Sequence, residues 1–169
     1  MTKECTIIVG DLHIGAGHQA DGNALEDFWH DDVFWDFVQG LVLESERGQM
    51  PVELVFAGDT FEFLQVPCLA EGERFDPRKE YAPERYEASS EAASLRKLSL
   101  IADGHPGFFA ALHGFIQAGE PSRKITFVKG DHDVNLHWES VQSALQVLLA
   151  DSESARSCVV FEERFVSRD

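Results

Sequence analysis

The sequence predicts an α/β fold with a mostly parallel central sheet. Three short runs rich in β-branched residues, at 6–9, 52–57 and 124–129, indicate buried strands, and each is followed by a glycine. Stretches with helical periodicity separate these runs, as in a sheet with crossover helices. A chain of 169 residues can bury a core of its own. We therefore expect a single domain over residues 1–169.

Apolar residues at helical spacing predict four helices, at 24–46, 84–101, 106–118 and after Trp138. In the last of these, one face carries Trp138, Val141, Leu145, Leu148 and Leu149. Residues 66–83 contain three prolines and no steady period, which indicates a long excursion between elements. The closing stretch "CVVFEERFVSRD" predicts one strand or two.

The charge balance restricts the classes of partner. The formal net charge is −16, which argues against nucleic acid and anionic membranes because binding to phosphates depends on Lys and Arg. No apolar run approaches the roughly 18 residues of a membrane span, and the first residues do not resemble a signal peptide. The three cysteines lack the spacing of a disulfide framework or a thiolate zinc site. We expect a cytoplasmic protein.

Each predicted strand ends in a glycine and an acid, within "GDLH", "GDTF" and "GDHD". We call residues 10–13, 58–61 and 130–133 the first, second and third corner. A single Gly-Asp pair is a common turn. If the strands are neighbours, however, the corners converge where α/β sheets bind ligands. They then bring together Asp11, His13, Asp59, Asp131, His132 and Asp133.

Four carboxylates this close need a compensating charge. One or two divalent cations supply it, and mixed imidazole and carboxylate ligands suit Mn, Fe or Zn better than Ca.

The three corners resemble the motifs of the calcineurin-like metallophosphoesterases, whose pattern is D-x-H, then G-D, then G-N-H-D or G-N-H-E. The resemblance extends from the first strand through the helix after Asp133. It implies an αββα sandwich, with two sheets between layers of helices. It also implies two divalent metal ions as cofactors and hydrolysis of a phosphoester bond in a small phosphorylated substrate.

The resemblance also assigns metal ligands. Asp11 and His13 correspond to ligands of the first metal, and Asp59 to the carboxylate that bridges both metals. Asp131 corresponds to an oxygen ligand of the second. Two cations held in this way activate a water as hydroxide and neutralise phosphate oxygens.

Two catalytic residues follow from the same resemblance. His132 corresponds to the group near the scissile phosphate that donates a proton to the leaving oxygen, and Asp133 to the residue that orients its ring. A histidine held by a carboxylate suits acid catalysis near neutral pH.

The chain departs from the family pattern at two places. Asp131 stands where the family has Asn, and its extra negative charge is expected to slow phosphate chemistry. The family's later histidines, including a G-H-x-H pair, are also missing, since only His137 follows Asp133. We therefore expect the N-terminal part of a phosphoesterase, incomplete at its C terminus. The origin stays open: a truncated chain, a degenerate relative, or a split gene whose partner chain supplies the rest. Self-association over an uncovered apolar face is a further expectation.

Two other functions remain alternatives. The missing histidines favour a metal-binding module that is inactive or needs a partner chain. The adjacent His132 and Asp133 suggest an HD-type phosphohydrolase, although in that class the ligands lie on helices. Substrates stay open among phosphomonoesters, phosphodiesters, nucleotides and a pyrophosphate-linked lipid precursor.

Smaller features have two interpretations each. Glu62, Phe61 and Phe63 follow the second corner and could line the site, whereas the two phenylalanines could instead pack in the core. The basic residues Arg74, Arg78 and Lys79 either overhang the metals or are solvated. Polar helix faces are expected for His30, His105 and His113, and a solvent-facing loop for His18.

Overall fold

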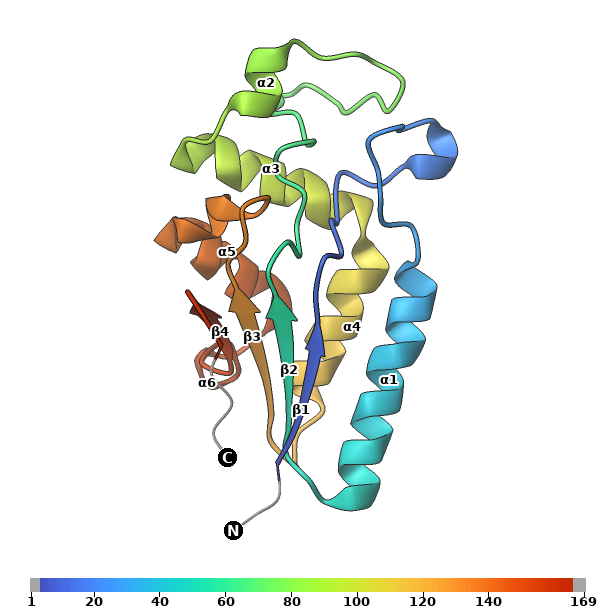
Figure 1. The fold of residues 1–169 in the computed structure, drawn as a ribbon, viewed down its shortest axis with the longest axis vertical. Helices are drawn as coiled ribbons and strands as arrows, with labels where there is room; N and C mark the ends of the chain where they lie inside the picture. Colours follow the sequence, from blue (N-terminus) through green and yellow to red (C-terminus); the bar gives the residue numbers. More distant parts are fainter. Residues whose placement is uncertain (1–3, 166–169) are drawn as a thin grey trace.

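Four parallel strands form the sheet in residues 4–165, the part of the chain that this computed structural model describes (Figure 1). They are β1 (Cys5–Val9), β2 (Val52–Ala57), β3 (Arg123–Val128) and β4 (Val159–Glu162). The strands lie in chain order, and each neighbouring pair is parallel. The predicted α/β class and the parallel sheet are therefore confirmed.

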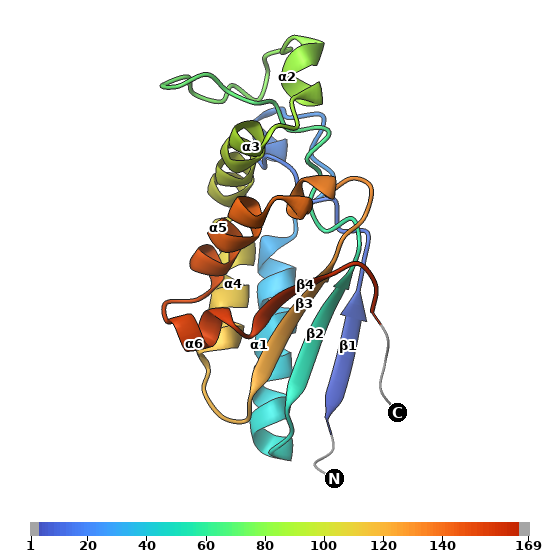
Figure 2. The same cartoon turned by 90° about the vertical axis from the view of Figure 1, so that its left-hand side faces the viewer.

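The longer helices gather on one side of this sheet. They are α1 (Asp31–Gly48), α3 (Glu91–Gly104), α4 (Pro106–Gln117) and α5 (Glu139–Leu149), and short helices α2 (Pro83–Glu87) and α6 (Glu153–Arg156) join them. Figure 2 shows α1, α4 and α5 beside one face of the sheet, with α3 on the same side beyond the strand ends. Among the described residues, no helix or strand covers the opposite face (Figure 2). The second sheet of a four-layer sandwich therefore does not occur within residues 4–165.

Aromatic side chains form the layer between the sheet and the helices. Phe127 of β3 stacks on Phe56 of β2 with ring centroids 4.8 Å apart, and on Phe161 of β4 at 5.6 Å. Phe34 of α1 and Phe108 of α4 pack against Phe56 from the helical side. Burying a side chain of this size contributes roughly 1.5–3 kcal/mol. This layer holds the strands, and therefore the loops at their ends, against the helices.

The opposite face of the sheet is mixed in character. Ile8 is 57% exposed there. Glu53 accepts a hydrogen bond of 2.6 Å from Thr126 and forms an ion pair of 2.8 Å with Lys124 on the neighbouring strand. Cross-strand pairs of this kind satisfy a polar surface, so only part of the face is apolar.

The helix predicted from residue 24 is wrong in its first turns, because α1 begins at Asp31. Glu26 is buried and accepts hydrogen bonds from the backbone of Gly15, Gly17 and Phe28. These tertiary bonds hold residues 23–30 as a loop, so Leu25 and Phe28, which lie in the predicted helix, are not helical. Trp35, an apolar residue inside α1, is 39% exposed.

The helix predicted at 84–101 is divided in two. Ser90 accepts a hydrogen bond from Ala93 and caps the start of α3, while α2 ends at Glu87. The helix predicted at 106–118 is confirmed as α4. In α5, Val141, Leu145 and Leu149 are buried as predicted, whereas Leu148 is 40% exposed.

The predicted closing strand is β4, and residues 166–169 lie outside the described part. No helix that the structure describes is long and apolar enough to cross a bilayer.

Candidate metal centre

The first two corners are joined by backbone hydrogen bonds beyond the end of the sheet. His13 donates its amide to Asp59 O at 3.0 Å, and Ile14 donates to Thr60 O at 3.0 Å. Glu62 donates back to Ile14 O at 2.9 Å. The parallel pairing of β1 and β2 thus continues past both glycines, which brings Asp11, His13 and Asp59 to one place.

The third corner is joined to the second by side chains as well as backbone. His132 donates its amide to Asp59 Oδ1 at 3.0 Å, and Phe63 donates to His132 O at 3.2 Å. Gly130 must be glycine because a Cβ at this position would lie 2.1 Å from Asp59 Oδ1. The three corners therefore converge as the sequence predicts.

Asp11, His13 and Asp59 form one candidate metal-ligand group. Each offers a ligand atom, and these atoms lie within 4.8 Å of one another. All three residues have positive φ angles, of 53°, 49° and 47°, in a region that non-glycine residues rarely adopt. Backbone strain of this kind concentrates at functional sites, where the surrounding structure maintains it.

Glu62 is the carboxylate that contacts both histidines of the corners. Its Oε2 lies 2.9 Å from His13 Nδ1 and 2.5 Å from His132 Nδ1, and the residue is fully buried. The two imidazole rings meet edge to face with centroids 4.7 Å apart. An ionised carboxylate only accepts hydrogen bonds, so an Nδ1 that is bonded to ionised Glu62 is the donor, and this contact leaves the Nε2 of each ring for other partners. His13, Glu62 and His132 form a second group, whose ligand atoms also lie within 4.8 Å of one another.

The environment of His132 favours its protonated form. The hydrogen bond with Glu62 raises the pKa of His132 above its usual value, and the charges of Glu62, Asp59 and Asp131 act in the same direction. Its side chain keeps 33% exposure. His132 is therefore an accessible imidazole that holds a proton readily.

Asp133 faces the backbone rather than the ring of His132. The residue is fully buried and accepts hydrogen bonds from Gly130 at 2.6 Å and from Thr60 at 2.9 Å. Burial raises the pKa of Asp133, although these backbone hydrogen bonds oppose the shift. Asp133 therefore joins the second corner to the third through these backbone hydrogen bonds. The carboxylate that contacts the ring of His132 is Glu62, not Asp133 as expected.

Asp131 lies in the third corner with an exposed side chain. Among the described residues, it belongs to neither group of close ligand atoms. His137 is also exposed and lies beside Lys129 and Glu163. Of the predicted ligands, Asp11, His13 and Asp59 thus form a close group for one divalent cation, whereas Asp131 joins no such group in the described residues.

The donor set of the first group fits a divalent cation. Two carboxylates and one imidazole match the ligand preferences of Mn, Fe and Zn, and a cation offsets the repulsion between the acids. Asp11 is exposed, which leaves the group open to solvent.

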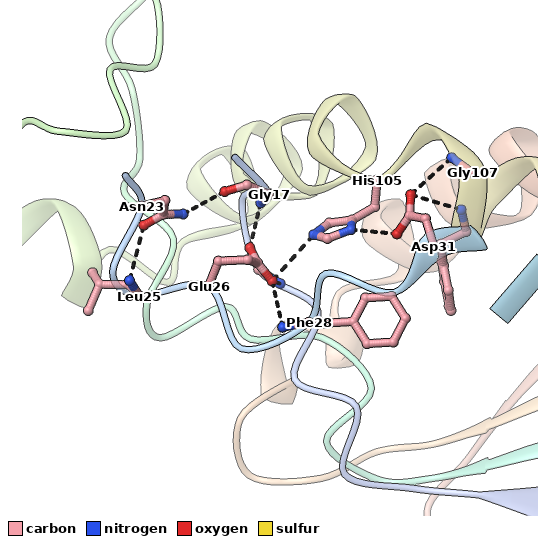
Figure 3. A network of polar contacts seen from close by, with 10 residues as sticks. Gly17, Asn23, Leu25, Glu26, Phe28, Asp31, His105 and Gly107 are labelled. Carbon is pink, nitrogen blue, oxygen red and sulfur yellow. Dashed lines mark hydrogen bonds and ion pairs between the residues drawn. The ribbon is translucent and has the colours of Figure 1, made fainter. Parts of the chain in front are cut away.

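A buried ionic network, shown in Figure 3, fixes the loop that follows His13. His105 lies between Glu26 and Asp31, with Nε2 3.4 Å from Glu26 Oε1 and Nδ1 2.8 Å from Asp31 Oδ1. Burial lowers the pKa of His105, but the hydrogen bonds and charges of Asp31 and Glu26 outweigh it and raise the pKa to about 9. The predicted polar-face position of His105 is wrong, since the residue is 3% exposed.

This network also caps a helix. Asp31 accepts hydrogen bonds from Gly107 and Phe108 in the first turn of α4. The loop of residues 14–30 is thereby attached to the junction of α3 and α4 (Figure 3).

The chain matches no protein-family model, and searches of curated proteins and of solved structures find no match either. The likeness to the calcineurin-like family therefore rests on the residues of the three corners.

Proposed function

We propose that this chain is a metal-dependent hydrolase of phosphoester bonds, or the metal-binding part of one, built as the N-terminal part of a metallophosphoesterase-like sandwich. One observation carries the proposal. Asp11, His13 and Asp59 come from two corners 48 residues apart and still place their ligand atoms within 4.8 Å of one another. His132, from the third corner, lies beside them, with its ring in contact with that of His13.

Under this proposal Asp11, His13 and Asp59 hold a divalent cation of the Mn, Fe or Zn type, and Asp59 and Asp131 contribute to a second. When bound, the cations supply an activated water and neutralise phosphate oxygens. His132 donates the proton from Nε2 to the leaving oxygen, while Glu62 orients the ring through Nδ1. Asp133 keeps the third corner in place through its two backbone hydrogen bonds.

A test combines metal content with turnover. We expect purified protein loaded with Mn²⁺ to retain the ion through gel filtration and to hydrolyse an aryl phosphate. His132→Ala should reduce kcat by about 10²–10⁴-fold, the usual contribution of a general acid, while metal content stays unchanged. Asp59→Asn should lower both. Hydrolysis that is unaffected by either substitution contradicts the proposal.

The second candidate is a metal-binding protein without hydrolase activity. The exposed Asp131, which lies outside both groups of close ligand atoms in the described residues, favours it. In the same experiment this candidate predicts stoichiometric metal that depends on Asp59, with no turnover of any phosphate ester.

A further inference from the structure

A cavity of about 600 Å³ lies among the segments that follow the first two corners, and its lining residue Leu64 is hydrogen-bonded to Glu62 at the candidate metal centre. Its walls are residues 22–25, which follow the first corner, parts of the segment 75–87, and three residues that follow the second corner, Leu64, Gln65 and Pro67. This volume is within the usual range for sites of small organic ligands.

Hydrogen bonds made by wall residues hold the cavity open without a ligand. Arg78 Nε donates to Asp21 O at 2.9 Å, which ties the segment 75–87 to the wall on the other side. Tyr81 is 4% exposed, stacks on Phe75 and accepts a hydrogen bond of 2.8 Å from Asp76. Such a pre-formed site loses little conformational entropy on binding.

One wall is attached to the loop that follows His13. Asn23 lines the cavity, and its Nδ2 donates to Gly17 O at 2.8 Å. Gly17 is in turn held by Glu26, which belongs to the ionic network with His105 (Figure 3). The position of this wall is therefore fixed relative to the first corner.

Another wall is attached to Glu62 and His132. Leu64 lines the cavity, and its amide donates to Glu62 Oε1 at 3.2 Å, while Oε2 of the same carboxylate faces the two histidines. Lys97, which is 1% exposed, donates to Phe63 O at 2.9 Å and to Tyr86 O at 2.6 Å, so the cavity residue Tyr86 is joined to the second corner. Glu62 and the second corner therefore contact both the cavity wall and the candidate metal centre.

The lining is apolar, with a few polar groups. Leu25 and Leu64 are 41% and 48% exposed although they line a cavity, and Pro67, Phe75 and Tyr86 extend this surface. Two bases, Arg78 and Lys79, and two acids, Glu80 and Glu87, also line it. The charges in the lining therefore balance, in contrast to the net charge of −16 of the whole chain.

We infer that this cavity binds the apolar organic group of the phosphoester substrate while its phosphate lies at the three corners. The inference rests on the proposed function, and it makes the substrate a monoester of a bulky apolar alcohol or phenol rather than a small polar phosphate. Burial of the organic group against Leu25, Leu64 and Tyr86 supplies the selectivity.

The test compares ligands that differ only in apolar area. Benzylphosphonate and 2-naphthylmethylphosphonate carry a C–P bond that resists hydrolysis, so their binding to the Mn²⁺-loaded protein is measured by calorimetry. Phenyl phosphate and 2-naphthyl phosphate report turnover in parallel. Leu64→Ser and Leu25→Ser shorten cavity side chains, and Leu43→Ser, at a 51% exposed position on α1, is the matched control.

We expect the naphthyl phosphonate to bind about ten-fold more tightly than the benzyl compound, as added apolar area predicts. Leu64→Ser and Leu25→Ser should each reduce this preference by about three-fold or more, and Leu43→Ser should leave it unchanged. The ratio of kcat/KM for the two esters should follow the same order.

The outcomes separate the two proposals. Hydrolysis of both esters with no naphthyl preference, or with a preference that Leu64→Ser and Leu25→Ser leave intact, overturns the cavity inference and leaves the hydrolase standing. Selective binding of the naphthyl phosphonate without hydrolysis of either ester supports the cavity as the apolar binding site and contradicts the hydrolase. Equal binding of both phosphonates overturns the cavity inference whatever the turnover.

Discussion

Glu62 is the residue on which the geometry of the corners depends most. Its carboxylate accepts from Leu64 through Oε1 and contacts His13 and His132 through Oε2, with no exposure to solvent. A buried carboxylate is stable only when its hydrogen bonds are satisfied, and here the two imidazoles satisfy them. Glu62 therefore orients two rings that come from corners far apart in the sequence.

We predict that Glu62→Gln lowers the pKa of His132 toward the usual value for histidine. The hydrogen bond with Glu62 is the largest cause of the raised pKa, and a neutral amide removes most of its effect. An NMR titration of the His132 ring in metal-free protein measures this change. Glu163→Gln, which replaces an exposed acid beside His137, is the control and should leave His132 unaffected. An unchanged His132 pKa in Glu62→Gln would show that another group holds the proton.

Asp131 supports a second prediction at the residue scale. Its carboxylate is exposed in the third corner and adds negative charge beside His132, where a substrate phosphate is expected. Asp131→Asn removes this charge and retains an oxygen ligand, so kcat for an aryl phosphate should rise by about three-fold or more. Steady-state kinetics of the Mn²⁺-loaded proteins measure the change. A kcat in Asp131→Asn that is equal to or lower than that of the wild type contradicts the prediction that the Asp131 carboxylate slows hydrolysis.

At the scale of elements, one ionic network connects the loop after β1 with the start of α4. His105, at the junction of α3 and α4, bridges Glu26 and Asp31 from the loop and from the first turn of α1. Gly104 lets these segments approach closely, because a Cβ there would lie 2.2 Å from Ala16 O. The loop that carries part of the cavity wall is thereby attached to two helices.

This network predicts a pH-dependent stability. The pKa of His105 is raised to about 9, so its protonation stabilises the fold fully below pH 6.5, and this contribution is lost as the pH rises through 9. The full effect amounts to about 3 kcal/mol. Urea unfolding between pH 6 and 10 should therefore show that His105→Gln is strongly destabilised at pH 6 and much less so at pH 10.

The pH dependence of wild type alone does not isolate His105, because Lys97 changes the free energy of unfolding with pH in the opposite direction. Burial lowers the pKa of Lys97 to about 8, so the penalty for its buried charge falls as the pH rises. The difference between wild type and His105→Gln cancels this contribution. His113→Gln, at the partly exposed pair of His113 with Asp151, is the control. A difference in free energy of unfolding that is the same at every pH would refute the charged state of His105.

Local sequence signals predict the strands and most helices correctly. The β-branched runs before Gly10, Gly58 and Gly130 are the three predicted strands, because burial and propensity act within each run. The start of α1 is missed because Glu26 bonds to backbone groups nine and eleven residues earlier, outside the helical pattern. The break before α3 has a local signal in Ser90, whose capping role outweighs the apolar periodicity.

The residues around the corners are predicted only where a motif marks them. The convergence of Asp11, His13 and Asp59 follows from Gly-Asp pairs at the ends of parallel strands. The contact of Glu62 with His132 joins residues 70 positions apart, and that of His105 with Asp31 joins residues 74 apart. No local pattern encodes such contacts, since the first depends on how the loops after β2 and β3 meet and the second on how α1 lies against the junction of α3 and α4.

At the scale of the whole molecule, the acidic charge makes a bound cation a stabilising partner. A ligand that binds only the folded chain raises stability with its concentration, and acidic corners gain most from a divalent cation. We predict that excess Mn²⁺ raises Tm by about 4 °C or more, and that Asp59→Asn removes most of this increase. Asp36→Asn, an exposed acid on α1, should retain it. Thermal unfolding measures these changes. An equal rise in Tm in Asp59→Asn and Asp36→Asn would indicate that Mn²⁺ only screens charge in general.

The whole molecule also has one face of the sheet that no described helix or strand covers. It combines exposed Ile8 with the Glu53 pairs, and no described element packs on it. The sandwich that we propose would cover this face with a second sheet, which a partner chain or self-association would supply.

The most direct test of a metal centre at the three corners is anomalous diffraction from crystals grown with Mn²⁺. We predict an anomalous difference peak within coordination distance of Asp11, His13 and Asp59, and its loss in Asp59→Asn crystals. Crystals that diffract well and contain Mn²⁺ elsewhere, or nowhere, with the three side chains free of metal, would contradict the account.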